Sequence, residues 1–333
     1  MQEQLALAVI GCGRIGKVHA KNIINSVPNA KVKTVTDCWS SAAEWVNQVA
    51  GVQFTTDVDS VFTDSEVDAV LICSSTDTHV KYIIAAAEAG KHIFCEKPID
   101  QDVNNIQKAI DAVIKAGVKF QIGFNRRFDH NFRAVKKAII DGVIGDVHFI
   151  NITSRDPEAP PVEYVKVSGG MFMDMTIHDF DMARFLTGSE VTEVYAKGAV
   201  LINPEIGKAG DIDSAVIVLQ FADGAIGTIN NSREAAYGYD QRVEVFGSKG
   251  SVEIRNDSAS SAVISTKDGI MSEKPFNFFM DRYTQSYVSE IKEFIDAIQN
   301  DSDVPATAKD GLESVVIAKA AAKSTRTGLP VKL

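Results

Sequence analysis

Residues 5–16 read Leu5-Ala6-Leu7-Ala8-Val9-Ile10-Gly11-Cys12-Gly13-Arg14-Ile15-Gly16, an apolar run that leads directly into three spaced glycines. The run has the length of a buried strand, and the residues from Ile15 to Ile24 have helical spacing. Glycines at such a turn let the backbone approach a pyrophosphate closely, and the helix N-terminus directs free N–H groups at the anion. The stretch therefore predicts a dinucleotide site, with a glycine-rich structural turn as the alternative.

An acidic residue, Asp37, closes the next predicted strand at about the ~20-residue distance that this type of site requires. A carboxylate there accepts hydrogen bonds from ribose hydroxyls and repels a 2′-phosphate. No Arg or Lys follows within Cys38-Trp39-Ser40-Ser41, so NAD is favoured over NADP. The other use of Asp37 is as a helix N-cap, although Ser40 is available for that role.

The first 125 residues alternate between short apolar runs and segments with helical spacing, which predicts a doubly wound parallel sheet. The expected strands are Leu5–Ile10, Lys31–Thr36, Ala69–Ile72, His92–Cys95 and Phe120–Ile122. The expected helices are Ile15–Ile24, Ala42–Val49, His79–Ala89 and Val103–Ala116. We therefore expect residues 1–125 to form a NAD-binding Rossmann domain.

Residues 126–333 have a different pattern, in which apolar and polar residues alternate along strands joined by hairpin-type turns. After a helix that ends at Ile140, the expected strands are Val147–Ser154, Val191–Val200, Ser214–Phe221, Ala225–Asn231, Arg242–Phe246 and Ser251–Ile254. Two helices, Tyr283–Gln299 and Asp310–Lys323, close the chain, and the last is a candidate to pack back on the first domain. Alternation of this kind predicts a largely antiparallel open sheet in an α+β domain for substrate binding and oligomerisation.

Length and composition exclude several classes of protein. With 333 residues the chain is long enough for two domains, and 34 Lys and Arg against 44 Asp and Glu give 34 − 44 = −10, which argues against nucleic acid as a partner. The apolar runs fall far short of the ~18 residues that a membrane helix needs. Met1-Gln2-Glu3-Gln4 does not resemble a signal peptide, and the four cysteines form no CxxC pair, so we expect reduced thiols in the cytoplasm.

Two more segments lie where strands of the predicted parallel sheet end. Cys73-Ser74-Ser75-Thr76-Asp77-Thr78-His79 follows a buried strand and offers small hydroxyl residues to a cofactor, or simply caps the next helix. Cys95-Glu96-Lys97-Pro98 follows the next strand, and the proline keeps Lys97 extended at the edge where ligands bind in open α/β sheets. A solvated surface lysine is the alternative for Lys97. The expected cofactor contacts are Gly11, Gly13, Arg14, Ile15, Gly16, Asp37, Ser74, Ser75, His79, Glu96 and Lys97.

A candidate general base lies in the second half of the chain. Asp174 and His178 are four residues apart in a segment with apolar helical spacing, so one helix would bring their side chains together. A carboxylate beside an imidazole fixes its tautomer and raises its basicity. Asp179 is expected to be structural. A metal site at Asp174, His178 and Asp181 is the competing use, but the sequence offers no further ligand cluster, so we expect no metal.

Three motifs together resemble the glucose–fructose oxidoreductase/inositol dehydrogenase family. They are the glycine loop extended through Lys17-Val18-His19, the segment Gly90-Lys91-His92-Ile93-Phe94-Cys95-Glu96-Lys97-Pro98, and the pattern Gly170…Asp174…His178-Asp179. Within the family, Gly123-Phe124-Asn125-Arg126-Arg127-Phe128-Asp129 and Tyr237-Gly238-Tyr239-Asp240-Gln241-Arg242 are most similar to bacterial inositol 2-dehydrogenases. The resemblance covers essentially the whole chain.

The resemblance implies a function and roles for individual residues. The expected reaction is the NAD-dependent oxidation of a secondary hydroxyl of a cyclitol, myo-inositol to 2-keto-myo-inositol (scyllo-inosose), in inositol catabolism. Lys97 would hydrogen-bond the reacting hydroxyl, and Asp174 and His178 would remove its proton. Further substrate contacts are expected at Arg127, Asp156 and Tyr239. Members of the family are commonly homotetramers.

Two alternatives stay open at this point. One is another substrate, either scyllo-inositol or a different sugar or polyol, because Ser154-Arg155-Asp156-Pro157 departs from the His/Asn pattern of some inositol dehydrogenases. The other is a protein of a different class, a regulator that binds NAD without turnover. Such a regulator has no need of Lys97, Asp174 and His178 together.

Overall fold

The computed structural model describes residues 4–333 and divides the chain into two compact units. The first unit extends to Phe128 and also contains Gln285–Glu313, and the second consists of Asp129–Thr284 and Ser314–Leu333. The segment 285–313, which we expected in the second domain, therefore belongs to the first unit. Residues 1–3, which carry most of the expectation about a signal peptide, lie outside the described residues.

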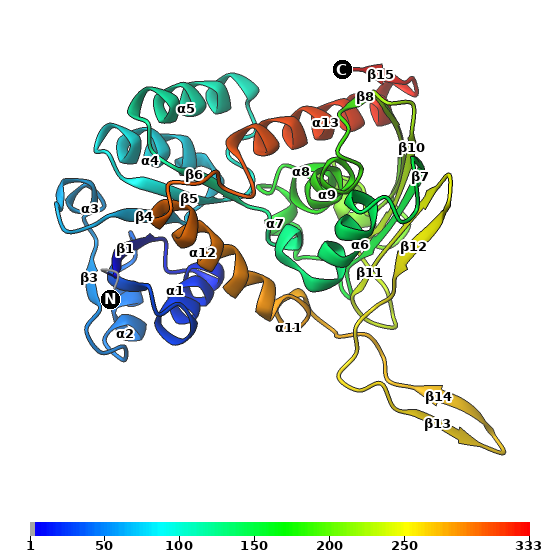
Figure 1. Ribbon diagram of the computed structural model, residues 1–333, viewed down its shortest axis with the longest axis horizontal. Coiled ribbons are helices and arrows are strands. Elements are labelled where there is room, and N and C mark those ends of the chain that lie inside the picture. Colours follow the sequence, from blue (N-terminus) through cyan, green and yellow to red (C-terminus); the bar gives the residue numbers. More distant parts are fainter. Residues whose placement is uncertain (1–3) are drawn as a thin grey trace. The chain divides into compact units, whose positions relative to one another are not determined.

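The first unit contains a parallel sheet with the strand order β3-β2-β1-β4-β5-β6 over the described residues (Figure 1). Its strands are β1 (Leu5–Ile10), β2 (Ala30–Thr36), β3 (Gln53–Thr55), β4 (Ala69–Ile72), β5 (His92–Glu96) and β6 (Phe120–Gly123). This is the strand order of a dinucleotide-binding Rossmann sheet. The expected doubly wound fold is confirmed. Sequence analysis missed β3, which is three residues long.

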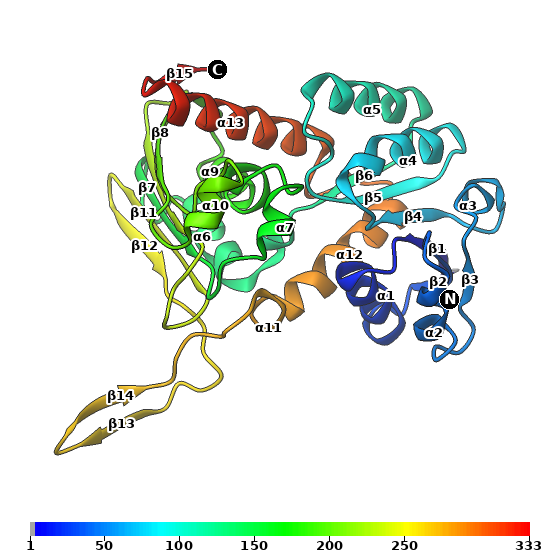
Figure 2. The same cartoon turned by 180° about the vertical axis from the view of Figure 1, so that it is seen from behind.

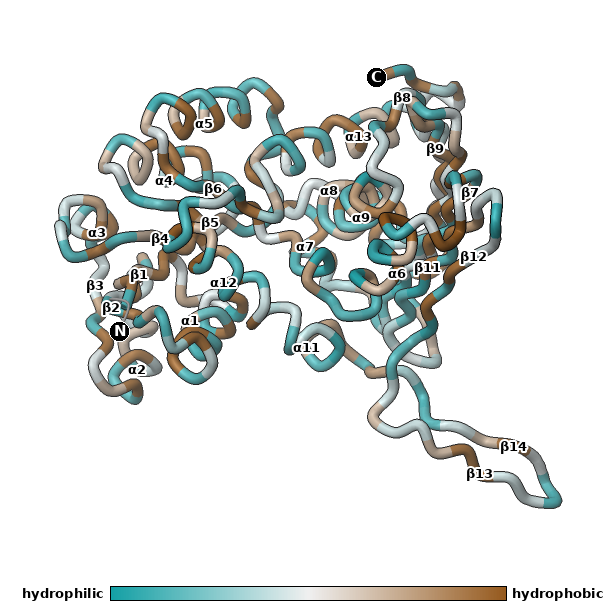
Figure 3. Tube along the Cα trace, viewed as in Figure 1, coloured by the Kyte–Doolittle hydropathy of each residue, from teal (hydrophilic) through white to brown (hydrophobic). Residues whose placement is uncertain are grey.

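Helices cover both faces of this sheet, with α4 and α5 on one face and α1 and α12 on the other (Figures 1 and 2). The helices and helical turns of the unit are α1 (Arg14–Ser26), η1 (Ser40–Ala42), α2 (Ala43–Val46), α3 (Asp59–Thr63), α4 (Thr76–Glu88), α5 (Val103–Ala116), η2 (Asn125–Phe128), α12 (Thr284–Gln299) and the start of α13 (Ala308–Thr327). Hydrophobic and hydrophilic residues alternate along α4, α5 and α13, as in amphipathic helices (Figure 3).

Helix α12 joins the first unit because its apolar residues lie in that unit's core. Ile291, Phe294 and Ile295 are fully buried in a cluster with Leu7 and Val9 of β1. Their spacing of three and four residues puts them on one helical face. Removing that much apolar surface from water stabilises the association by about 1.5–3 kcal/mol for each large side chain. The hydrophobic effect thus explains why a segment so late in the sequence completes the first unit.

The second unit contains a mixed sheet with the order β12-β11-β7-β10-β9-β8-β15 over the described residues. Its strands are β7 (Val147–Arg155), β8 (Val191–Ala199), β9 (Ser214–Phe221), β10 (Ile226–Ser232), β11 (Asp240–Gly247), β12 (Gly250–Ile254) and β15 (Val331–Lys332). All neighbouring pairs are antiparallel except β7 and β10, which run parallel. The expected largely antiparallel open sheet is confirmed.

One face of this sheet is buried because apolar and more polar positions alternate along its strands. In β9, Ala215, Ile217, Leu219 and Phe221 are buried, whereas the residues between them are more exposed. The helices of the unit are α6 (His130–Ile140), α7 (Val162–Val165), α8 (Met171–Asp174), α9 (Ile177–Thr187), α10 (Pro204–Lys208), α11 (Phe279–Arg282) and the rest of α13. A hairpin of β13 (Val263–Thr266) and β14 (Gly269–Ser272) extends away from the sheet (Figure 2). None of the helices in residues 4–333 has the length and apolar character to cross a membrane.

Candidate active site

The glycine loop lies between β1 and α1, beside the end of β4. Gly11 has a φ of +97°, and a Cβ at this position would lie 2.7 Å from the carbonyl of Cys73. A Cβ at Gly16 would lie 1.9 Å from the carbonyl oxygen of Gly11. Both positions therefore require glycine, since a side chain would displace the backbone of the loop or of the segment after β4.

The N-terminus of α1 has no side-chain cap. Gly13 is the N-cap, where no side-chain oxygen accepts a hydrogen bond, and the first turn of α1 contains no acidic residue. No atom lies within 4 Å of the place where a Cβ of Gly13 would be. A helix N-terminus with this open approach attracts an anion, because its N–H groups and dipole both favour negative charge. The residues of the loop therefore fit the pyrophosphate of a dinucleotide.

The Asp37 carboxylate lies against the same loop. Oδ2 accepts a hydrogen bond of 2.7 Å from the backbone N–H of Cys12, and Oδ1 accepts one of 2.9 Å from the N–H of Trp39. A carboxylate oxygen has two lone pairs, so each still has capacity for a ribose hydroxyl. Asp37 is thus fixed beside the glycine loop, where a residue that hydrogen-bonds the adenosine ribose must lie.

The segment after β4 is held mainly by its own hydrogen bonds. The hydroxyls of Ser74 and Thr78 are 2.6 Å apart. The buried His79 ring has Nδ1 2.8 Å from the carbonyl oxygen of Pro98 and Nε2 3.0 Å from that of Ser74. Burial lowers the pKa of His79, and a neutral ring can donate to only one of these oxygens. His79 therefore joins α4 to the segment that carries Lys97, and its contact with a cofactor stays a prediction, as do those of Ser74 and Ser75.

Glu96 and Lys97 lie where β5 ends, in the first unit. Glu96 is the last residue of β5 and pairs with Gly123 of β6. Its Oε1 is 2.7 Å from Nε2 of His19, on α1. Lys97 follows directly, half-buried, before Pro98. The lysine is thus at the carboxyl edge of a parallel sheet, where open α/β folds bind their ligands.

Asp174 and His178 belong to the second unit, but not to one helix as we expected. Asp174 ends α8, and His178 is the second residue of α9. The helix is interrupted at Met175 and Thr176, and the hydroxyl of Thr176 donates to Oδ1 of Asn231 at 2.7 Å. A Thr hydroxyl that bonds outside the helix favours such a boundary.

The end of β10 supports both helices. Asn231 accepts from Thr176 and donates through Nδ2 to Oδ2 of Asp179 at 2.8 Å. Asp179 is fully buried, and this contact confirms its expected structural role. Two residues after Asn231, Arg233 lies 3.3 Å from Oδ2 of Asp174. A single strand end therefore fixes the start of α9, next to His178, and the carboxylate of Asp174.

Three further residues determine the environment of Asp174, and sequence analysis missed all of them. The guanidinium of Arg233 is buried between Asp174 and Asp211, 3.4 Å from Oδ2 of the latter. Tyr164 of α7 donates its hydroxyl to Oδ1 of Asp174 at 2.8 Å. Asp211 also accepts from the N–H of Met171, at the start of α8. The one signal in the sequence is the polar run Asn230-Asn231-Ser232-Arg233-Glu234, in which Arg233 directly follows the strand.

Arg127, an expected substrate contact, is held by an ion pair, and its contact with a substrate stays a prediction. Its guanidinium is buried and forms two contacts with the Asp310 carboxylate, of 2.9 and 3.1 Å, and one with the carbonyl oxygen of Pro305. Burial alone would raise the pKa of Asp310, but the charge of Arg127 and the hydrogen bonds from Thr307 outweigh it and hold that pKa at about 2. This bidentate ion pair joins the end of the Rossmann sheet to the start of α13.

Asp156 and Tyr239 meet at one edge of the second unit's sheet. Arg155, which ends β7, pairs with Asp240 at the start of β11, so the residues just beyond them are neighbours. Arg155 also pairs with Ser232 at the end of β10, next to Arg233. Asp156, Tyr239 and Arg233, which holds Asp174, therefore lie at the same edge of the sheet. Their contact with a substrate stays a prediction.

Comparison with known proteins identifies both halves of the chain. Residues 5–124 match the oxidoreductase family with an NAD-binding Rossmann fold, and residues 132–253 match the GFO/IDH/MocA C-terminal domain. The chain is 49% identical to an inositol 2-dehydrogenase of Rhizobium meliloti, over 95% of each chain. It is 44% identical to a myo-inositol 2-dehydrogenase of Thermotoga maritima, over 99% of this chain and 98% of the relative.

A solved structure is also similar to this chain. The scyllo-inositol dehydrogenase of Lactobacillus casei, with bound cofactor NAD(H) and scyllo-inositol, superposes with a TM-score of 0.93 at 32% identity and 99% coverage of both chains. The fold, the glycine loop and these relatives all indicate the same family. The chain therefore belongs to the oxidoreductase family whose members combine an NAD-binding Rossmann fold with a GFO/IDH/MocA C-terminal domain.

Proposed function

We propose that this protein is an NAD-dependent inositol 2-dehydrogenase that oxidises the C2 hydroxyl of myo-inositol to the ketone, giving 2-keto-myo-inositol. The main support for the proposal is that Asp174, at the end of α8, and His178, at the start of α9, are held in place in a chain that also has a dinucleotide-binding loop. A protein that only binds NAD has no use for a buried arginine that holds the Asp174 carboxylate in place. The names of the closely similar relatives support inositol as the substrate.

In the proposed mechanism, bound NAD supplies the acceptor for the hydride that leaves C2. His178 takes the hydroxyl proton on a ring nitrogen, and Asp174 orients the imidazole and supports its positive charge. Arg233 and Tyr164 keep the Asp174 carboxylate in place through the contacts described above. The ammonium of Lys97 stabilises the negative charge that develops on the oxygen as the proton leaves.

The substrate hydroxyls would be bound at the edge of the mixed sheet. Asp156 and Tyr239 supply a carboxylate and a phenol there, both suited to a polyol. Arg127 is a further proposed substrate contact, and its guanidinium is fixed by the pair with Asp310. A relative solved with scyllo-inositol makes oxidation of that isomer the second candidate.

We also propose that the protein is a cytoplasmic homotetramer that serves inositol catabolism. The outward face of the mixed sheet exposes large apolar side chains, at Phe149, Tyr195, Val216, Val218, Ile226 and Phe246. Contiguous apolar surface of this kind is typical of subunit interfaces. The free thiols of Cys12, Cys38, Cys73 and Cys95 suit a reducing compartment.

The test is a substrate panel. The protein is mixed with NAD and, in separate reactions, myo-inositol, scyllo-inositol, glucose and other aldoses, and the absorbance of reduced nicotinamide is followed. We expect the highest kcat/KM with myo-inositol. Faster turnover of an aldose than of either inositol would contradict the proposal, and no turnover of any of them would favour a protein that binds NAD without catalysis.

A further inference from the structure

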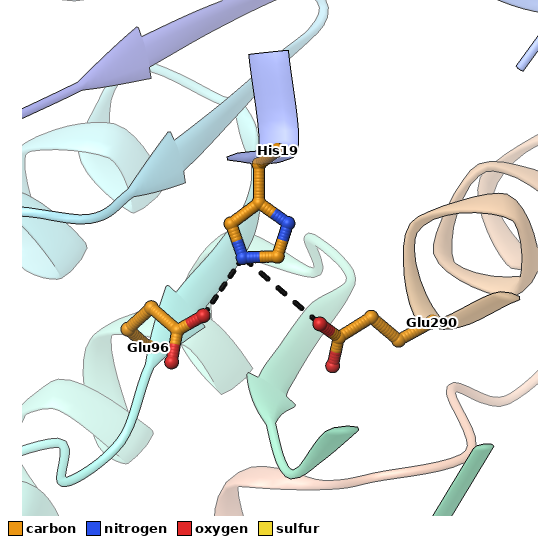
Figure 4. Close-up of side chains that lie close together, drawn as sticks. All are labelled: His19, Glu96 and Glu290. Atoms are coloured by element: carbon orange, nitrogen blue, oxygen red, sulfur yellow. Dashed lines mark hydrogen bonds and ion pairs between the residues drawn. The ribbon is translucent and has the colours of Figure 1, made fainter. Parts of the chain in front are cut away.

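Three ionisable side chains from distant parts of the sequence meet inside the first unit (Figure 4). His19 comes from α1, Glu96 from the end of β5, and Glu290 from α12. Nε2 of His19 lies 2.7 Å from Oε1 of Glu96 and 3.9 Å from Oε1 of Glu290. We call these three residues the His19 cluster. The proposed mechanism uses none of its side chains.

The cluster is shielded from water. The side chains of His19 and Glu290 have 0% exposure, and that of Glu96 has 14%. The His19 ring packs edge-on against Phe94 and Tyr287, with centroid distances of 5.1 and 5.8 Å. Transferring a charged group into such surroundings costs several kcal/mol unless it is paired. Two carboxylates and one imidazole would leave a buried negative charge if both acids were ionised.

Glu290 is the fully buried acid of the cluster. Among the described residues, neither of its carboxyl oxygens has a hydrogen-bond partner, so no donor stabilises an ionised form. Burial raises the pKa of Glu290 well above its usual range, and the negative charge of Glu96 adds to the effect. The ionisable groups that face it are His19, Glu96 and the buried thiol of Cys73. Burial and the absence of a hydrogen-bond donor thus both favour the uncharged form of Glu290.

Glu96 is the acid that contacts the His19 ring directly. Nε2 of His19 is within hydrogen-bond distance of Oε1 of Glu96, whereas Nδ1 of His19 has no hydrogen-bond partner among residues 4–333. On the other side, Oε2 of Glu96 would lie 3.1 Å from a Cβ at Gly123, so β6 approaches the carboxylate closely. The amide of Gln121, also on β6, donates to the backbone carbonyl of Glu290 at 2.9 Å. The Glu96 carboxylate is thus contacted by α1 and lies close to β6, which is itself hydrogen-bonded to α12.

Lys97 is the next residue after this carboxylate. We propose that His19 and the uncharged acid Glu290 are positioning residues that hold Glu96 in one place, and with it the backbone that carries Lys97. The inference rests on the proposed role of Lys97 in oxidation. It goes further because it gives a function in catalysis to α1 and α12 residues that touch neither substrate nor reacting atoms. A displacement of about 1 Å at a catalytic group can cost roughly 100-fold in rate.

The first experiment compares His19→Leu with His19→Gln. Leucine removes the donor to Glu96, whereas the Gln amide can reach the former place of Nε2. With saturating NAD and inositol, we expect His19→Leu to lower kcat by roughly 10-fold to 100-fold and His19→Gln to recover most of it. The affinity for NAD, measured by fluorescence titration, should change less than 3-fold. Equal losses in both variants, or a loss explained entirely by weaker NAD binding, would overturn the inference.

The second experiment needs neither substrate nor cofactor. A folded-state pKa above the unfolded value makes stability fall as pH rises between the two. Glu290→Gln keeps the shape of the uncharged acid and removes this ionisation, so its melting temperature should exceed that of the wild type, by roughly 3 °C or more at pH 9 and by less at pH 5. The exposed Glu88, on α4, provides the matched control, and Glu88→Gln should show no such dependence. A Glu290→Gln protein that is less stable at both pH values would show that Glu290 is ionised and paired, which overturns the inference.

Three other results bear on the state of the cluster or on its positioning role. One divalent ion per chain in the purified protein, lost together with thermal stability in His19→Leu, would show a metal site in place of a proton-holding cluster. If the wild type oxidises no cyclitol, the proposed function fails, but the pH dependence of Glu290→Gln still tests the state of the cluster. If the wild type is active and His19→Leu matches it in kcat, the positioning role fails alone.

Discussion

Arg233 and Asp174 form a buried ion pair in which the arginine, 1% exposed, lies 3.3 Å from the carboxylate. The same guanidinium is 3.4 Å from Asp211, which in turn accepts a hydrogen bond from Met171 at the start of α8. Arg233 therefore fixes both ends of the short helix that carries Asp174. Because it directly follows β10, the sheet determines the position of the carboxylate.

Replacing Arg233 with Met should leave Asp174 and Asp211 as two nearby carboxylates without a compensating charge. Breaking a buried pair in this way costs about 3–5 kcal/mol of folding free energy. We expect a lower melting temperature and, in the folded fraction, a kcat reduced at least 10-fold. Arg255→Met is the matched control, since Arg255 is an exposed arginine paired with Glu253. If Arg233→Met kept the wild-type kcat, Asp174 would not depend on the pair.

Cofactor preference should depend on Asp37. Asp37→Ala combined with Ser40→Arg removes the charge that repels a 2′-phosphate and adds one that attracts it. We expect kcat/KM for NAD to fall and that for NADP to rise, measured by reduction of each cofactor at saturating inositol. A wild-type protein that already turned over NADP faster than NAD would refute this role of Asp37.

Stability at acid pH should depend on Asp310. A pKa of about 2, below the ordinary value of 3.8, means that ionised Asp310 stabilises the folded state above pH 4 and that this contribution is lost as the pH falls toward 2. We therefore expect Asp310→Asn to lower the unfolding free energy by about 2 kcal/mol at pH 6, with a smaller difference at pH 3. Urea unfolding measures it, with the exposed Asp111→Asn as control. An equal loss at both pH values would mean that the charge of Asp310 is not responsible.

Lys97 should act on the developing negative charge more than on substrate binding. Lys97→Met keeps most of the apolar stem, so we expect turnover to fall much more than inositol affinity. Lys97→Arg should recover little, because a planar guanidinium cannot replace a compact ammonium. Steady-state kinetics, with NAD affinity measured in parallel, separate the effect on turnover from the effect on binding. A higher KM with unchanged kcat would make Lys97 a binding residue only.

Much of the fold could be predicted from local sequence patterns. Val103–Ala116 was predicted to the residue, because Asp102 caps its N-terminus through the N–H of Asn104 and Gly117 ends it in the left-handed conformation. The bounds of the strands β1, β4 and β9 were also predicted to the residue. Each is either a short apolar run or a short segment in which buried and exposed positions alternate. These elements are specified by side chains within a few residues of one another.

Other features depend on contacts between distant residues, and local patterns could not show them. The break between Asp174 and His178 depends on Asn231, more than fifty residues later. The ion pair of Arg127 depends on Asp310, and the His19 cluster draws on three elements between residues 19 and 290. The β13–β14 hairpin was missed because its strands are exposed on both faces and lack a buried period.

The most direct test of the account is transfer of a labelled hydrogen. Myo-inositol carrying deuterium at C2 is incubated with the wild-type protein and NAD, and the reduced cofactor is analysed by mass spectrometry. We predict one deuterium in each reduced cofactor, formed roughly 100-fold to 10,000-fold more slowly by His178→Ala, whose affinity for NAD should be unchanged. Reduced cofactor without deuterium, or a His178→Ala protein as fast as the wild type, would contradict the account.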